Sequence, residues 1–288
     1  PSGFTPRFGT EYDDYQIVGG LRGEASDRFS YDLSASLGRN RIDYTMRESL
    51  NASLGPDSPT SFYLGRLRQN EFNLNADFVY RLPLGLSDPA NIAFGAERRK
   101  ESYAIFPGDP ASYAIGPGAA SGLAPNSNGF PGFSPLNAGE WSQTSHAGYI
   151  DVEVRPAEML TLGAAGRYED FSAFGDTFNY KLSARLEPVR GMAMRATYST
   201  GFRAPTPGQL NAVNTTQGLD TTTLQIFNRG RLSPSDPIAV ALGAQPLKPE
   251  KSRNLTAGLT FQSSFGLTAS IDVYQIKLRD RFGQSATF

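Results

Sequence analysis

Residues 28–38 read RFSYDLSASLG, and this stretch decides the fold class. Its apolar residues stand at every second position and alternate with Ser or Asp: Phe29, Tyr31, Leu33, Ala35 and Leu37. Because successive side chains of a β-strand point to opposite faces, this period predicts a strand with one apolar and one polar face. The same alternation returns in residues 181–187 and 254–262.

The alternation predicts about ten strands, each near or beyond the ~9–11 residues that a tilted strand needs to cross a bilayer. Strands of soluble proteins are more often ~5–6 residues long. The mean hydropathy of −0.36 excludes a helical membrane protein, but not a barrel, whose strands face lipid only at alternate residues. The predicted strands cover residues 14–24, 28–47, 62–82, 90–106, 141–155, 159–174, 177–188, 191–203, 250–263 and 266–282.

The connections between these strands differ in length on the two sides. One side has short joints, at residues 25–27, 83–89, 156–158, 189–190 and 264–265. The other side includes long joints at residues 48–61, 107–140 and 204–249, with a short exception at residues 175–176. Short turns on one side and long loops on the other are typical of an outer-membrane barrel.

The loop at residues 107–140 is rich in Gly, Pro, Asn and Ser. From this composition we expect it to be mobile and unable to bury a core. No helix is predicted anywhere in the chain.

Composition and motifs exclude several other classes. The chain has 27 Lys+Arg against 28 Asp+Glu, which gives no electrostatic reason to expect a nucleic-acid partner. It has no Cys, and His146 is its only His, so no metal site and no cofactor are predicted. Nucleophile-elbow, phosphate-loop and zinc-protease motifs are absent, so the chain is not expected to be an enzyme.

Two segments carry a more specific signal. The first is YSTGFRAP, which contains Gly201, Phe202, Arg203, Ala204 and Pro205. The second is LKPEKSRN with a following Gly, which contains Leu247, Pro249, Glu250, Ser252, Asn254 and Gly258. In this order and spacing they resemble the later barrel strands of TonB-dependent outer-membrane receptors. Proline presets φ and ends a hydrogen-bonded ladder, so we expect a structural role for Ala204-Pro205 and Pro249-Glu250.

The resemblance implies an all-β, transmembrane antiparallel β-barrel in the bacterial outer membrane, of the 22-stranded type that encloses a plug. Residues 1–288 are then expected to form part of the barrel domain, without the plug domain of the family. The implied partners are the lipid bilayer, the plug of the same chain, the TonB complex acting through that plug, and a small-molecule cargo such as a ferric siderophore. With only about ten strands, the segment is expected not to close into a barrel.

Cargo contacts are expected on the long loops. The aromatic and polar candidates are Tyr103, Phe106, Tyr113, Phe130, Phe133, Trp141, Asn228 and Arg229. Packing within the loops is the alternative role for the same side chains. Charged residues on the lumen side could contact a plug or simply form ion pairs along the wall: Arg167, Glu169, Lys181, Arg185, Glu187, Arg195 and Arg203.

Two other kinds of protein stay open at this point: a passive porin or barrel enzyme of the outer membrane, and a soluble all-β binding module. A passive porin would need an acidic or basic loop that folds inward to narrow the channel. A soluble all-β binding module would need its apolar faces to meet in one core, and the predicted strand lengths disfavour that arrangement.

Overall fold

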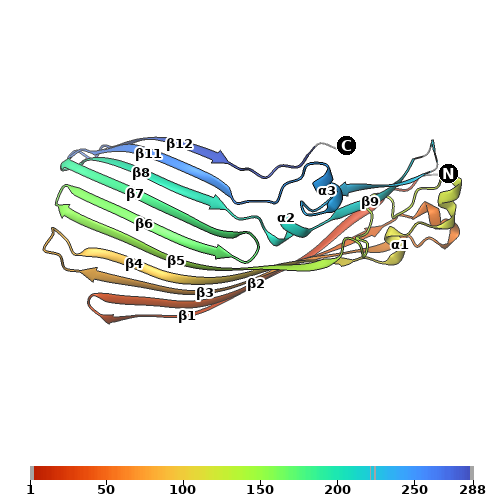
Figure 1. Cartoon of the computed structure of the whole chain (residues 1–288), viewed down its shortest axis with the longest axis horizontal. Helices are drawn as coiled ribbons and strands as arrows, with labels where there is room; N and C mark the ends of the chain where they lie inside the picture. Colours follow the sequence, from red (N-terminus) through yellow and green to blue (C-terminus); the bar gives the residue numbers. More distant parts are fainter. Residues whose placement is uncertain (1–2, 221, 224, 286–288) are drawn as a thin grey trace.

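The computed structural model describes residues 3–220, 222–223 and 225–285, with the side chains of residues 215–217, 226 and 228 outside that description. It contains one antiparallel sheet of ten strands in the order β1-β2-β3-β4-β5-β6-β7-β8-β11-β12 (Figure 1). The strands are β1 (Arg7–Ser26), β2 (Phe29–Arg47), β3 (Ser61–Leu82), β4 (Ala90–Pro107), β5 (Gly139–Ala157), β6 (Leu160–Phe171), β7 (Gly175–Val189), β8 (Met192–Arg203), β11 (Glu250–Gln262) and β12 (Thr268–Arg279).

These ten strands confirm the all-β prediction, and each sequence-predicted strand corresponds to one of them. The largest difference is at β1, which begins at Arg7 rather than at residue 14. Residues 7–13 show little alternation, but their backbone pairs in register with residues 41–47 of β2. Cross-strand pairing therefore extends the strand beyond what local sequence preference indicates.

The predicted sorting of the connections is also present. The short turns gather at one end of the sheet, and the long loops gather at the other end (Figure 1). The loop side carries elements that the sequence did not predict: α1 (Pro110–Tyr113), α2 (Pro207–Asn211), α3 (Pro237–Ala241), two 3₁₀ turns, and a hairpin of β9 (Asn214–Leu219) and β10 (Ile226–Arg231). The prediction of no helix is wrong because helices of four or five residues are too short to show a helical period.

The sheet does not close on itself. Its first and last strands, β1 and β12, are both edges, as expected for a segment of about ten strands. Among the described residues, no helix has the length and hydropathy needed to cross a membrane.

On the turn-side half of the sheet, one face is apolar and the other is polar. The apolar face, here called the outer face, includes a row of directly paired residues formed by Tyr31, Phe78, Phe94 and Ile150. The opposite, inner face carries Asp77 and other polar residues on the intervening positions. An apolar outer face and a polar inner face are the pattern of a wall between lipid and a wet lumen.

Toward the loop side, the polarity of the two faces is exchanged. The outer face becomes polar and the inner face becomes apolar. On β2, the outer positions change from Leu37 to Arg39 and Arg41. The inner positions become apolar at Ile42 and continue through Tyr44. The loop-side half of the wall therefore has a polar outer surface, and its apolar surface is on the inside.

The loop at residues 108–138 covers this inner apolar surface. Phe130 packs against a cluster of Met46, Phe62 and Leu64, each of which is at most 3% exposed. Phe133, 8% exposed, packs in a second cluster with Ile105. The wall and the loop together form the core of the loop-side half.

The expectation that this loop cannot bury side chains is therefore wrong. Its backbone polar groups find partners inside the protein, which satisfies the requirement that buried polar groups be hydrogen-bonded. The side-chain amide of the fully buried Asn51 donates to the backbone carbonyls of Ala111 and Ala114, at 2.8 and 2.9 Å. The Ser53 hydroxyl accepts from the Gly116 amide at 2.8 Å, which ties the 48–60 connection to the same loop.

A β-bulge in β3 provides the docking point for the loop. Tyr44 pairs with Gly65 and Thr45 pairs with Tyr63, so Leu64 is skipped in the ladder. The free Leu64 carbonyl accepts from the Phe133 amide at 2.8 Å. Gly65 has φ +113°, and a Cβ there would clash with the Phe106 carbonyl oxygen. Glycine is therefore required for both the backbone conformation and the space.

Gly65→Ala is expected to lower the free energy of unfolding by roughly 1–3 kcal/mol, because it forces a side chain into a backbone region that favours glycine. Urea unfolding in detergent micelles, followed by tryptophan fluorescence, measures the change. Gly148→Ala is the control, because its Cβ would meet only the Gly95 carbonyl oxygen at 3.9 Å. Equal stability of the two variants would contradict the role of the bulge.

Phe133→Ala is expected to release the loop from the wall, because burial of a Phe side chain in a core contributes about 3–5 kcal/mol. Limited proteolysis mapped by mass spectrometry should show faster cleavage within residues 108–138. Phe106→Ala is the matched control, since Phe106 lies on the outer face beneath Arg68 and away from the loop. Cleavage at the same rate in both variants would show that Phe133 does not hold the loop.

Candidate functional site

The inner face of the turn-side half is lined by ion pairs that run from strand to strand. Arg99 on β4 pairs with Glu71 on β3 at 2.7 Å, and also with Glu101. Arg167 on β6 pairs with Glu97 on β4 and with Glu169, both at 3.0 Å. These charged side chains of the inner face are therefore joined in ion pairs along the wall.

The other predicted lumen charges also have partners. Lys181 lies 3.6 Å from Asp151, and Arg195 lies 2.7 Å from Asp272. Arg185 pairs with Glu187 at 2.8 Å on its own strand. These pairs are partly exposed to water, which screens their contribution to stability.

Four of the predicted cargo residues lie together on the inner face of the loop-side half. Tyr103 and Trp141 are directly opposite each other on β4 and β5. Both pack against the cluster that contains Phe133, and Phe130 lies edge-on to Phe133 with ring centroids 6.4 Å apart. These rings hold the loop against the wall, and most of their surface is already in contact with the protein.

A second segment, residues 204–213, covers the same aromatic group from the other side. Helix α2 begins with a capping box in which the Thr206 hydroxyl accepts from the Gln209 amide and the Gln209 side chain accepts from the Thr206 amide. Gly208 in α2 lies against the Tyr103 ring, and Ala212, which follows the helix, is buried beside Phe133. Loops from two distant parts of the sequence therefore meet over Tyr103.

The remaining predicted cargo residues lie elsewhere. Phe106 is on the outer face, with the Arg68 guanidinium 4.9 Å from its ring centroid. Tyr113 is half-buried in α1. Arg229 is exposed on β10 of the projecting hairpin, and the Asn228 side chain is outside the described part of the structure. The candidates therefore do not form one site.

The two family-like segments meet at the loop-side ends of β8 and β11. β8 ends at Arg203 and β11 begins at Glu250, and these two residues are directly paired. The Glu250 side chain, 12% exposed, lies 3.5 Å from the Arg203 guanidinium and accepts from the Phe282 amide at 2.9 Å. The Arg203 guanidinium also lies over the Phe282 ring. Glu250 thus joins β8, β11 and the segment that follows β12.

The other motif residues support the same junction. Gly201 is directly opposite Ser252, and a Cβ at Gly201 would lie 2.8 Å from the Ser252 hydroxyl. Phe202 packs edge-on against Phe171 of β6. The side-chain amide of Asn254 donates to the Ser199 hydroxyl at 3.4 Å, which continues the polar contacts between the two strands.

Gly258, Pro205 and their neighbours complete the motif geometry. Gly258 lies between Arg195 and Asp272, where it leaves room for their ion pair to cross β11. Pro205 is fully buried, while Ala204 is half-buried. Pro249 is buried immediately before β11, and Leu247 is half-buried two residues earlier.

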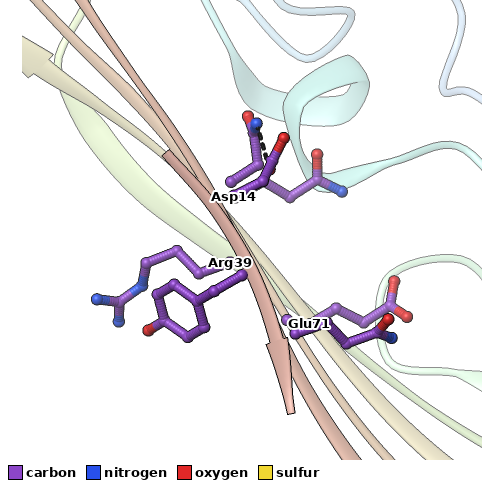
Figure 2. Close-up of a pocket in the computed structure, with 8 residues that line it drawn as sticks. Asp14, Arg39 and Glu71 are labelled. Atoms are coloured by element: carbon purple, nitrogen blue, oxygen red, sulfur yellow. Dashed lines mark hydrogen bonds between the residues drawn. The ribbon is translucent and has the colours of Figure 1, made fainter. Parts of the chain in front are cut away.

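A hollow of about 440 Å³ lies on β1–β3 where the outer polarity changes. Figure 2 shows Asp14 and Glu71 on one side of the strands and Arg39 on the other. Gly38 is among its lining residues, and the absence of a side chain there leaves space open. Since the sheet divides its lining, the hollow does not enclose a cargo site.

No group of three His, Cys, Asp or Glu that could hold a metal ion occurs among the residues that the structure describes. The inner apolar surface that the loops cover was not predicted from the sequence. A signal for it was present, because Ile42, Tyr44 and Met46 alternate with charged or polar residues in the opposite phase to residues 29–37.

Glu250→Ala is expected to destabilise the protein by about 1–3 kcal/mol, because it leaves the half-buried Phe282 backbone amide without its acceptor. Glu250→Gln retains a carbonyl oxygen for that amide and should lose less than about 1 kcal/mol. Urea unfolding measures both variants. A loss in Glu250→Gln as large as that in Glu250→Ala would show that the charge, rather than the hydrogen bond to Phe282, stabilises the junction.

Comparisons with known proteins agree with this geometry. The iron-regulated outer membrane virulence protein of Vibrio cholerae is 29% identical over 147 residues, which cover 50% of this chain and 20% of that protein. The siderophore receptor PirA from Pseudomonas aeruginosa has a similar fold, with a TM-score of 0.54, 15% identity, and coverage of 93% of this chain and 46% of that one. The RagAB peptide transporter has a TM-score of 0.61 at 12% identity, and covers 95% of this chain and 30% of that one.

The chain thus spans a fifth of the length of the Vibrio relative and less than half of the two solved structures. Its match to a family covers residues 1–288 in full, and the family is described as "TonB dependent receptor-like, beta-barrel". With its ten antiparallel strands and its two paired motif segments, the chain belongs to the β-barrel family of TonB-dependent receptors of the bacterial outer membrane.

Proposed function

We propose that this chain forms part of the barrel wall of a receptor that imports a scarce solute, such as a ferric siderophore, with energy from the TonB complex. On this proposal, residues 1–288 are a partial barrel domain, and a plug domain of the same protein fills the lumen. Membership of the family supports the TonB-driven mechanism.

The observation that carries a receptor role is the concentration of loop structure on one side of the sheet. The loops at residues 108–138 and 204–213 pack against the inner face, while the β9–β10 hairpin projects from the same end (Figure 1). Loops that rest on a rigid wall provide positioned side chains for cargo recognition. Among the predicted cargo residues whose side chains are described, Arg229 on the hairpin is exposed and the others are half-buried or buried, so it has the greatest freedom to reach a solute.

The inward packing of the 108–138 loop resembles a porin constriction only in its direction. Asp109 is the only charged residue in that loop, and its carboxylate accepts from the Tyr63 amide. A constriction that selects ions needs a ring of charge, which this loop cannot supply. A receptor is therefore favoured over a passive porin.

Two kinds of cargo are suggested by the relatives. PirA is named as a siderophore receptor, and RagAB is named as a peptide transporter. We favour a ferric siderophore because the Vibrio relative is named as iron-regulated.

Growth complementation can test this function. The full-length receptor is expressed in cells that lack their own siderophore receptors, with and without a functional TonB complex. Under iron limitation, we expect a supplied ferric siderophore to restore growth only in the cells with TonB. Uptake that persists without TonB would indicate a passive channel, whereas TonB-dependent growth on oligopeptides alone would replace the siderophore with a peptide.

A further inference from the structure

Four basic residues form a compact cluster on the outer face of β11 and β12. Lys251 is directly opposite Arg279, and Arg253 is directly opposite Lys277. All four side chains are exposed. Directly opposed residues of an antiparallel pair have Cβ atoms about 4.5–5.5 Å apart, and like charges at that separation destabilise the pairing.

No carboxylate within the described part of the chain offsets this repulsion. None of the four residues forms an ion pair there, although Arg195 and Arg203 on neighbouring inner positions both do. On the outer face of β2 and β3, by contrast, Arg41 and Arg66 share the carboxylate of Asp43 at 2.6 and 2.7 Å. The β11–β12 cluster is therefore an outward positive site that no carboxylate of the described residues pairs with.

The cluster begins where the outer face of β11 and β12 changes from apolar to polar residues. On β11, the outer positions change from Leu255 to Arg253. On β12, they change from Val273 through Gln275 to Lys277. The four cations thus begin where the apolar outer surface ends, on the loop side of the sheet.

Aromatic residues mark the same height. Tyr198 is directly opposite Leu255, and its ring lies 5.9 Å from that of Tyr180. On β7 the exposed Phe178 continues this aromatic surface toward the loops, and on β8 Phe202 is directly opposite Lys251. Rings near the loop-side end of an apolar outer surface have the position of an interfacial aromatic belt. The cations beside this belt face the level of the lipid headgroups.

We propose that the Lys251, Arg253, Lys277 and Arg279 cluster binds the phosphate groups of lipids in the outer leaflet. Phosphates at this level would screen the two opposed pairs, and Lys and Arg side chains donate charge-assisted hydrogen bonds to phosphate oxygens. The apolar surface below the cluster would contact the acyl chains of the same lipid. This inference depends on the outer-membrane location and not on the identity of the cargo.

Lipid binding to the purified full-length receptor in a non-ionic detergent tests the proposal. The probes are diphosphorylated lipid A, its dephosphorylated form and inorganic phosphate. The wild-type protein should prefer the diphosphorylated lipid, and Arg253→Gln/Lys277→Gln should weaken that binding by ~10–30-fold. The control is Arg28→Gln/Arg190→Gln, which removes two exposed cations at the turn end and should change the affinity by less than about twofold.

Thermal unfolding without added lipid separates binding from a purely structural role. Because Arg253→Gln/Lys277→Gln removes repulsion, the variant should unfold at the same temperature as the wild type or higher. Lys277→Glu places an acid opposite Arg253 and should likewise fold while losing lipid affinity. The proposal is overturned if the double variant binds diphosphorylated lipid A as well as the wild type does, if both lipid forms bind equally, if inorganic phosphate alone binds as tightly, or if the double variant is less stable without lipid.

Discussion

A strand surrounded by lipid has no water to satisfy its amide and carbonyl groups, so it must pair with neighbours along its whole length. The rest of this structure depends on that constraint. It explains why the ten long strands form one continuous antiparallel sheet, and why only two bulge-like irregularities interrupt the register of β1–β3. It also explains why irregular backbone gathers at the ends of the strands (Figure 1).

The strands are longer than the membrane requires, and this excess length creates a second environment. Where β2 and β3 leave the apolar layer, their outer face meets water and their inner face meets the protein's own loops. The change from Leu37 to Arg39 on one face and from Asn40 to Ile42 on the other follows from that exchange of surroundings. The loop at residues 108–138 then acts as a small core, docked through the bulge at Gly65.

The two segments that resemble the receptor family are physically one feature. Their residues are far apart in the sequence, but they pair in register at the ends of β8 and β11. The buried Glu250 carboxylate joins this pair to the segment that follows β12. The motif therefore stabilises the place where the wall meets its loops, which is the surface from which a receptor would present its cargo-binding side chains.

The sequence by itself determined the fold class, the order of the ten main strands and the sorting of the loops. These properties depend on local alternation and on turn residues, which can be read from one segment at a time. The reversed alternation at Ile42 and Tyr44 was also readable, but its meaning depended on knowing what covers that face.

Only the tertiary structure decided which loops meet over Tyr103, that Phe130 and Phe133 face the wall, and that the opposed cations of β11 and β12 share one outer patch. Such contacts join residues that are distant in the sequence. They depend on the register of pairing and on the path of the loops, and neither is encoded in the periodicity of any single strand.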